Sequence, residues 1–217
     1  MAIFPGSSIP SAVSDYDIDN SVRLNVPDDP YLTKQFAVSG NRRTWTISFW
    51  CKPKGIGTTE NQHIVKTKPD ANEQVQLCIN NNSVLFAYLE TGNVGYTLQT
   101  TQVFRDPSAW YQILWAVDTT QGTAANRSKL YVNGEQITAF DTEVYPAEDA
   151  EFPWNQASTN QDLFNSREDS WNRSFDGYIA EFYSIDGSAL GPDSFGELSS
   201  TTNQWIPLDS DDVKDAV

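Results

Sequence analysis

The sequence predicts an all-β protein, an antiparallel sandwich of two sheets with at most one or two short helical turns. Short runs with strand character recur along the 217 residues, clusters of Gly, Pro, Asn and Asp separate them, and no long helical period is present. Aromatic residues make up 12% of the chain, enough bulk to fill the space between two sheets. The predicted strands lie at about residues 21–26, 44–52, 63–67, 74–80, 84–89, 95–101, 110–117, 128–133, 135–140 and 177–185.

The best-defined stretch is residues 110–134, which begins with a long apolar run. Residues 110–117 carry one polar side chain, Gln112, so they predict a strand that is covered on both faces. Asn133-Gly134 lies between two alternating runs and favours a tight hairpin, because both central positions of a type I′ turn need positive φ. The stretch therefore predicts a buried central strand and a hairpin, which are typical of antiparallel sheets rather than of βαβ units.

The chain is predicted to hold one domain, residues 21–207, between two tails. Residues 1–20 contain proline and glycine without a clear period, and we expect an extended arm that becomes ordered against a neighbour. Residues 208–217 form an acidic tail that we expect to be loose unless a partner holds it. The helical turn that we expect follows Leu190, where Pro192 and the adjacent acid suit a helix start.

The formal net charge of −15 limits the classes of partner. Nucleic-acid binding depends largely on Lys and Arg against phosphate, so we expect no nucleic-acid partner. Solubility is the plain explanation of the acidity, with a surface for divalent cations or adaptation to a salty medium as alternatives. The sequence shows no signal-peptide pattern and no transmembrane run, so we expect no membrane insertion. If the protein works outside a cell, we expect it to leave by a route other than ordinary secretion. Release on a virus particle at lysis is one such route.

The two cysteines, Cys51 and Cys78, cannot form a disulfide scaffold or, with the single histidine, a four-ligand zinc site. Their positions in the strand pattern point them to opposite faces, so we expect buried free thiols rather than a disulfide. The single histidine, His63, has no Ser, Cys or Asp constellation around it and is expected to be structural.

Several segments resemble laminin-G-like and concanavalin-A-like jelly rolls, in particular those encoded by tailed bacteriophages. LYVNG at 130–134, with the preceding apolar run and Asp118, is similar to the central motif of that fold, and FDGYIAE at 175–181 is similar to its last strand. The last-strand match ends at residues 185–187, and the further matches, which narrow the resemblance to phage proteins, are residues 31–32, 40–46, 193–197 and 204–205. Together the matches span roughly residues 16–207.

The resemblance implies a two-sheet jelly-roll sandwich and a structural protein on the exterior of a phage particle (the virion), as a capsid decoration or a tail or fibre component. Its implied partners are other virion proteins and further copies of itself, with host-surface glycan and attachment to the host as an additional expectation. A stand-alone carbohydrate-binding, lectin-like module is the alternative. The fold alone does not choose between them.

A polysaccharide hydrolase is the least expected function, so we predict no catalytic residue and no enzyme. Glycoside hydrolysis needs two carboxylates that flank the scissile bond. The densest acidic cluster, EDAE at 148–151, lies between Pro146 and Pro153, and its spacing does not place its acids on one strand face. Glu181 is expected to be a buried acid satisfied by an arginine or by loop amides, rather than a functional carboxylate.

The irregular segment from 141 to 173 is where we expect a glycan site, if there is one. Sugar binding needs an exposed aromatic face and neighbouring amides or acids. The alternative is that these aromatic side chains pin a long loop onto the sheet. Trp45, Trp50, Trp110 and Trp115 are expected in the core. The candidate glycan-binding residues are Tyr145, Trp154, Asn155, Trp171 and Asn172.

Calcium is the one cofactor that the sequence suggests. It takes about 6–8 oxygen ligands, and loop carboxylates supply them in related sandwiches. The chain shows no regular ligand spacing, so the hypothesis depends on the fold bringing separate acids together. The candidate ligands are Asp118, Asp141, Asp162 and Asp169.

Overall fold

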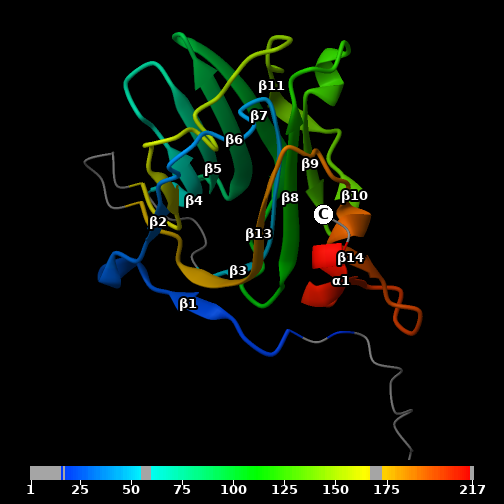
Figure 1. Cartoon of the computed structure of the whole chain (residues 1–217). Helices are drawn as coiled ribbons and strands as arrows, with labels where there is room; N and C mark the ends of the chain where they lie inside the picture. The colour runs from blue at the N-terminus through cyan, green and yellow to red at the C-terminus, as the bar shows by residue number, and fades with distance from the viewer. Residues whose placement is uncertain (1–15, 17, 55–59, 167–172, 216–217) are drawn as a thin grey trace, which may run out of the picture.

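The structure, a computed structural model, describes residues 16, 18–54, 60–166 and 173–215. Two large antiparallel sheets pack face to face, and a small two-stranded sheet and a short helix lie outside them (Figure 1). All pairings between the strands are antiparallel in the described part of the chain, which confirms the predicted sandwich.

The six-stranded sheet has the order β1-β13-β3-β8-β9-β10. Its strands are β1 (Val22–Leu24), β3 (Thr44–Pro53), β8 (Tyr111–Asp118), β9 (Ser128–Val132), β10 (Glu135–Gln136) and β13 (Gly177–Asp186). The apolar run predicted as a central strand forms β8, which lies between β3 and β9. Asn133 and Gly134 turn between β9 and β10 with φ of 48° and 81°, as the hairpin requires. These two predictions are confirmed.

The seven-stranded sheet has the order β11-β7-β6-β5-β4-β12-β2. Its strands are β2 (Leu32–Lys34), β4 (Gln62–Thr67), β5 (Gln74–Ile79), β6 (Val84–Thr91), β7 (Val94–Val103), β11 (Phe140–Glu143) and β12 (Gln161–Leu163). The strand predicted at 135–140 is wrong beyond Gln136, because the chain leaves the first sheet there and enters the second as β11. Short strands such as β2 and β12 lack a detectable alternation and form only because a neighbour pairs with them.

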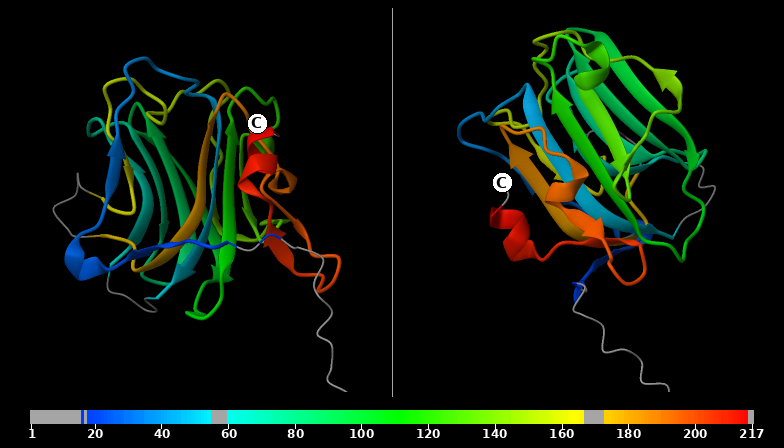
Figure 2. Two further views of the ribbon diagram at one scale, coloured as in Figure 1. Left: turned by 60° about the horizontal axis from the view of Figure 1, so that its bottom comes forward. Right: turned by 90° about the vertical axis from the view of Figure 1, so that its right-hand side faces the viewer.

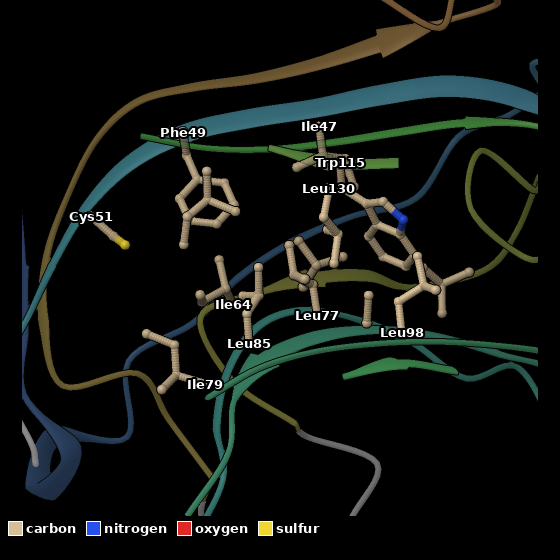
Figure 3. Close-up of a cluster of buried hydrophobic side chains, with 14 of the residues drawn as sticks. Ile47, Phe49, Cys51, Ile64, Leu77, Ile79, Leu85, Leu98, Trp115 and Leu130 are labelled. Atoms are coloured by element: carbon tan, nitrogen blue, oxygen red, sulfur yellow. The ribbon is translucent and has the colours of Figure 1, made fainter. Parts of the chain in front are cut away.

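The core lies between the sheets. Alternate residues of β3, including Ile47, Phe49 and Cys51, point toward Leu77 and other apolar side chains of the opposite sheet (Figure 3). Trp45 and Trp115 are almost completely buried and meet edge to face, with ring centroids 5.0 Å apart. Trp115 Nε1 donates a hydrogen bond to Ser128 Oγ at 2.9 Å, so its buried indole N–H is satisfied. The predicted core positions of these two tryptophans are confirmed.

Both cysteines are buried and free, as predicted. Cys51 belongs to the core between the sheets, whereas Cys78 accepts a hydrogen bond from Gln76 Nε2. Burial raises the pKa of Cys78 to about 12 and that of Cys51 still higher, so neither thiol is a nucleophile near neutral pH. His63 is completely buried in β4.

A second apolar cluster lies on the outer face of the six-stranded sheet. Leu114 and Ala116 of β8 contact Phe195 and Val213 of the C-terminal segment, residues 190–215. This segment crosses the outer face of the sheet (Figures 1 and 2). It comprises the single turn η3 (Pro192–Ser194), the hairpin β14 (Gly196–Leu198) and β15 (Trp205–Pro207), and the helix α1 (Ser210–Asp215).

The expectation of a loose acidic tail is therefore wrong for residues 208–213. Val213 is 1% exposed, because the outward apolar side chains of β8 need a cover and α1 provides it. The predicted turn after Leu190 is present as η3, whereas α1 was not predicted. Two more single turns, η1 (Val26–Asp28) and η2 (Ala124–Asn126), lie in connections. No helix in the described ranges has both the length and the apolar character to cross a bilayer.

Candidate functional site

An aromatic hollow lies on the outer face of the six-stranded sheet, at the end where β8 begins. We call it the tryptophan groove, and its volume is about 790 Å³. Trp50 of β3, Trp110 just before β8 and Trp205 of β15 meet there. The rest of its lining consists of Thr101, Gln102, Val132, Asn133, Glu135, Gln136, Ile137, Thr138, Ala139, Leu198, Asn203 and Gln204.

Strand alternation places Trp50 in this groove. Because Phe49 and Cys51 point into the core, Trp50 between them points outward. Trp110 is half-buried and its ring leans toward Tyr178 of β13, with centroids 6.4 Å apart. The prediction of a core position is confirmed as burial for Trp50, which is 7% exposed, and is wrong for Trp110, which is half-buried; neither side chain belongs to the cluster between the sheets. Both lie on the opposite side of the sheet, where the C-terminal segment forms the facing wall of the groove.

Trp205 is positioned by two glycines. A Cβ atom at Gly134 would lie 2.5 Å from the Trp205 ring, and one at Gly196 would lie 2.7 Å from it. Gly134 also has a φ of +81°, so the hairpin turn and the close approach of the indole both require glycine there. The β9–β10 turn and the β14–β15 hairpin are thereby clamped together by one ring.

Gln112 connects the groove to the sheet below it. Its Oε1 accepts a hydrogen bond from Trp205 Nε1 at 3.2 Å, and its Nε2 donates one to Ser48 Oγ at 3.1 Å. Gln112 is completely buried, so it needs these partners. The one polar side chain in the apolar run of β8 thus orients the indole of Trp205.

A second hollow of about 470 Å³ adjoins the tryptophan groove. Both hollows are lined by Trp50, Trp110, Gln204 and Trp205. The second hollow adds Tyr16, Ile18, Asp19, Ser21, Thr202, Ile206 and Pro207. The three indoles therefore form a common centre, with the β9–β10 hairpin on one side and the end of the N-terminal arm on the other.

Tyr16 is held in place by Glu181. Tyr16 Oη donates to Glu181 Oε1 at 3.3 Å, and Tyr183 Oη donates to the other carboxylate oxygen of Glu181. Burial and the adjacent Glu181 carboxylate raise the pKa of Tyr183. The expectation that an arginine or loop amides satisfy Glu181 is wrong, since tyrosine hydroxyls do so.

The strand pattern around Glu181 failed because β13 contains a β-bulge. The pairing of β13 with β3 shifts between Ala180 and Tyr183, and Glu181 has a φ of 47°. An extra residue reverses which side chains face the core, so Ile179 points inward while Tyr183 points outward. Glu181 is consequently half-buried on the outer face.

Of the glycan-binding residues predicted from sequence, Trp154 and Asn155 are corrected by the structure. Trp154 is 3% exposed and packs on Trp45, with centroids 6.2 Å apart. Asn155 is also buried, and its Nδ2 donates to Asn41 O and Asp186 Oδ1, both at 3.1 Å. These side chains pin the loop to the sandwich, which was the alternative interpretation.

The other predicted glycan-binding residues are not brought into the tryptophan groove by the described structure. Tyr145 is half-buried and its hydroxyl donates to Glu143 Oε1 at 2.6 Å. A role of Tyr145 in sugar binding stays a prediction. Trp171 and Asn172 lie outside the described residues.

The predicted calcium ligands are not brought together. Asp118 ends β8 and accepts hydrogen bonds from Thr120 and Gln121. Asp141 is in β11 and Asp162 in β12, and β7, β6, β5 and β4 lie between these two strands. Asp169 lies outside the described residues. Within the described ranges, no group of three or more His, Cys, Asp or Glu side chains could hold a metal ion.

The comparison with known families agrees with this architecture. The profile of the concanavalin A-like lectin/glucanases superfamily matches residues 25–193. The chain belongs to that superfamily. The resemblance inferred from the sequence motifs is thus confirmed at the level of the domain type. No curated protein sequence matches the chain.

Solved structures with a similar fold include carbohydrate-binding modules. Domain 4 of AbnA, a GH43 extracellular arabinanase from Geobacillus stearothermophilus, in complex with arabinotriose, is similar over 82% of this chain and 75% of its own, with a TM-score of 0.55 and 17% identity. The Ruminococcus gnavus IT-sialidase CBM40 bound to α2,3-sialyllactose is similar over 75% and 95%, with a TM-score of 0.51 and 19% identity. At such identities the likeness shows the fold.

Enzymes also contain this fold. The leech intramolecular trans-sialidase, solved with 2,7-anhydro-Neu5Ac, is similar over 76% of this chain but only 26% of its own, with a TM-score of 0.50 and 15% identity. The fold is therefore found in binding modules and in chains of enzymes, and the function has to be argued from the site.

Proposed function

We propose that this protein is a carbohydrate-binding module and that the tryptophan groove is its ligand site. The observation that carries the proposal is the meeting of Trp50, Trp110 and Trp205 in one hollow with amide side chains around them. Indole faces pack against the C–H face of a sugar ring, and the exposed amides of Gln136 and Gln204 can bond its hydroxyls. Two proteins of similar fold, solved with arabinotriose and with sialyllactose, support this class of ligand.

The same groove argues for binding without catalysis. Glycoside hydrolysis uses two carboxyl groups about 5–9.5 Å apart on either side of the scissile bond. Among the described residues that line the tryptophan groove, Glu135 is the single carboxylate. The acidic cluster noted in the sequence is engaged elsewhere, since Glu148 pairs with Arg127 at 3.0 Å and Glu151 with Arg43 at 3.1 Å.

Substitution of Trp110 tests the site. We expect Trp110→Ala to lower glycan affinity at least about tenfold, because an indole face in contact with a sugar contributes both apolar burial and stacking. The ligand is the first hit from a glycan array, and its affinity is measured by titration with intrinsic fluorescence as the signal. Circular dichroism checks the folding of each variant. Tyr145→Ala is the matched control, because Tyr145 is a partly exposed aromatic residue that lines neither hollow. Loss of binding in Tyr145→Ala but not in Trp110→Ala would move the site to the loop.

A location on the exterior of a bacteriophage particle, as a capsid decoration or a tail or fibre component, is our second proposal. The motifs at 31–32, 40–46, 193–197 and 204–205 support it by their resemblance to phage-encoded laminin-G-like proteins. An exposed apolar stretch at the sheet edge favours contacts with other virion proteins or with further copies of the chain. Its side chains are Tyr31, Leu32, Phe36 and Val38, with exposed fractions of 46%, 58%, 37% and 80%.

Particle labelling tests this location. In purified particles of a phage that encodes this chain, we expect a gold-labelled antibody against the protein to decorate the outside of the capsid or the tail. The control is the same antibody on particles of a deletion mutant. Absence of the protein from washed particles would contradict the virion role and leave the glycan-binding proposal intact.

A further inference from the structure

The two hollows have their tryptophans in common. Trp50, Trp110, Gln204 and Trp205 line both, so the two hollows adjoin at these four side chains. The first has a volume of about 790 Å³ and the second about 470 Å³. Pockets of about 300–1,000 Å³ each hold a ligand of drug size. A ligand that uses both hollows is therefore longer than one sugar ring.

The charge of this surface has one sign. Glu135 lines the first hollow and Asp19 the second, and both are exposed. No Lys or Arg is present among the described residues that line either hollow. The chain as a whole carries a formal charge of −15. A ligand with carboxylate, sulfate or phosphate groups would meet like charge and find no cation to pair with.

We infer that the adjoining hollows bind an extended, uncharged oligosaccharide across the half-buried indoles of Trp110 and Trp205, with the more deeply buried Trp50 in the lining. This inference rests on the proposed function, because it names the ligand class of the same site. The chain would run from the side of Gln136, over Trp110 and Trp205, to the side of Ile18. The amides along this path offer both donors and acceptors, which suits hydroxyl groups.

The inferred ligand differs in charge from the ligand of a protein with a similar fold. The CBM40 of similar fold is bound to sialyllactose, which carries a carboxylate. The tryptophan groove has no cation among its described lining residues to receive such a group. Similarity of fold therefore does not extend to ligand charge here.

The test is a matched panel of linear glycans presented to the full chain. The uncharged set holds di-, tetra- and hexasaccharides of glucose in α and β linkage, xylose, mannose, galactose, arabinose and N-acetylglucosamine. The acidic set holds the same lengths of galacturonate, glucuronate and mannuronate, together with sialylated and sulfated chains. We expect the hits to be uncharged, with affinity rising at least about tenfold from di- to hexasaccharide as the second hollow is filled.

The outcomes of the panel are distinguishable. Hits confined to the acidic set would overturn the charge part of the inference and leave the proposed function standing. An uncharged hit with equal affinity for the disaccharide and the hexasaccharide would overturn the extended site and also leave the proposed function standing. No hit in either set would contradict the proposed function and, with it, the inference.

Two substitutions test the inference on the protein itself. Ile18→Ala should lower the affinity for the hexasaccharide several-fold without changing the affinity for the disaccharide. The matched control Val22→Ala, at an exposed site outside both hollows, should change neither affinity.

Glu135→Lys should raise the affinity for acidic chains. Asp70→Lys changes the net charge equally at a distant exposed turn and should not raise that affinity. Equal effects of each substitution and its control would contradict the inference.

Discussion

Two segments that each carry one tryptophan beside amide side chains leave the sandwich, and they end in opposite environments. The connection at 144–160 joins β11 to β12, and it places Trp154 in the core at 3% exposure. The C-terminal segment, 190–215, follows β13 and leaves Trp205 half-buried in the wall of a groove. By composition the first segment is the better candidate for a sugar site. The position of the C-terminal segment in the fold, however, makes it the better candidate, because its tryptophan lines a groove.

The difference arises from what each segment has to cross. β11 and β12 lie on opposite sides of β7, β6, β5 and β4, so their connection spans the width of the sheet and closes the end of the sandwich. It bonds to the other sheet's loops on the way, for example from Phe152 N to Arg42 O at 3.2 Å. The C-terminal segment instead covers an outer face that is already apolar, so its own indole stays outside the core. The role of a tryptophan in this fold thus depends on which face its segment covers.

Trp154→Ala should have the strongest effect on stability of the substitutions considered, because Trp154 is buried at 3% exposure whereas Trp205 is not. We expect the free energy of unfolding to fall by about 3–5 kcal/mol, the cost of removing a buried tryptophan. Urea denaturation followed by far-ultraviolet circular dichroism measures it. Glycan affinity per folded molecule should stay unchanged, and a loss of affinity without a loss of stability would show that the connection carries the site.

A smaller loss, of at least about 2 kcal/mol, is expected for Gly134→Ala. Strain at positive φ and an overpacked contact with the Trp205 ring each cost about 1–3 kcal/mol. Displacement of the indole should also lower glycan affinity. Gly122→Ala is the control, because a Cβ atom there meets nothing within 4 Å. Similar stability of the two variants in thermal denaturation would contradict the clamp between the two hairpins.

Gln112→Leu tests whether the buried amide of Gln112 orients the Trp205 indole in the tryptophan groove. It leaves Trp205 Nε1 and Ser48 Oγ without their partner, and we expect the free energy of unfolding to fall by about 1–3 kcal/mol. Glycan affinity should fall as well, because the indole loses its orientation. Gln112→Glu keeps an acceptor for the indole and should retain more affinity in the same titration. Identical affinities of both variants would argue against an orienting role for Gln112.

The smallest effect concerns pH and Tyr145, in the connection. Burial, the hydrogen bond to Glu143 and the charge of that carboxylate raise the pKa of Tyr145 to about 12, above its ordinary value of 10.0. A raised pKa stabilises the fold below the ordinary value, and this contribution is lost as the pH rises toward 12. Stability in urea should therefore fall more steeply between pH 10 and 12 in the native chain than in Tyr145→Phe. Parallel curves would mean that the hydroxyl is free, as a sugar-binding tyrosine would be.

Local sequence patterns were sufficient to predict the strands that alternate over six or more residues, the buried course of β8 and the Asn133-Gly134 turn. These features depend on side chains within a few positions of one another, and a short window contains all of that information. The two buried cysteines follow from the same alternation. The motifs at 130–134 and 175–181 were enough to indicate the superfamily, since they combine such local signals.

Which tryptophans line a surface depends on contacts between distant segments and could not be predicted from local patterns. Trp50 points outward by alternation, but whether an outward residue is core or groove depends on the C-terminal segment, more than 130 residues away. The bulge at Glu181 and the separation of Asp141 from Asp162 likewise depend on strand pairing across the sheet. Strand pairing, and the packing of one segment over the face of a sheet, depend on the total apolar area that distant segments bury against each other. A local sequence pattern does not contain this information.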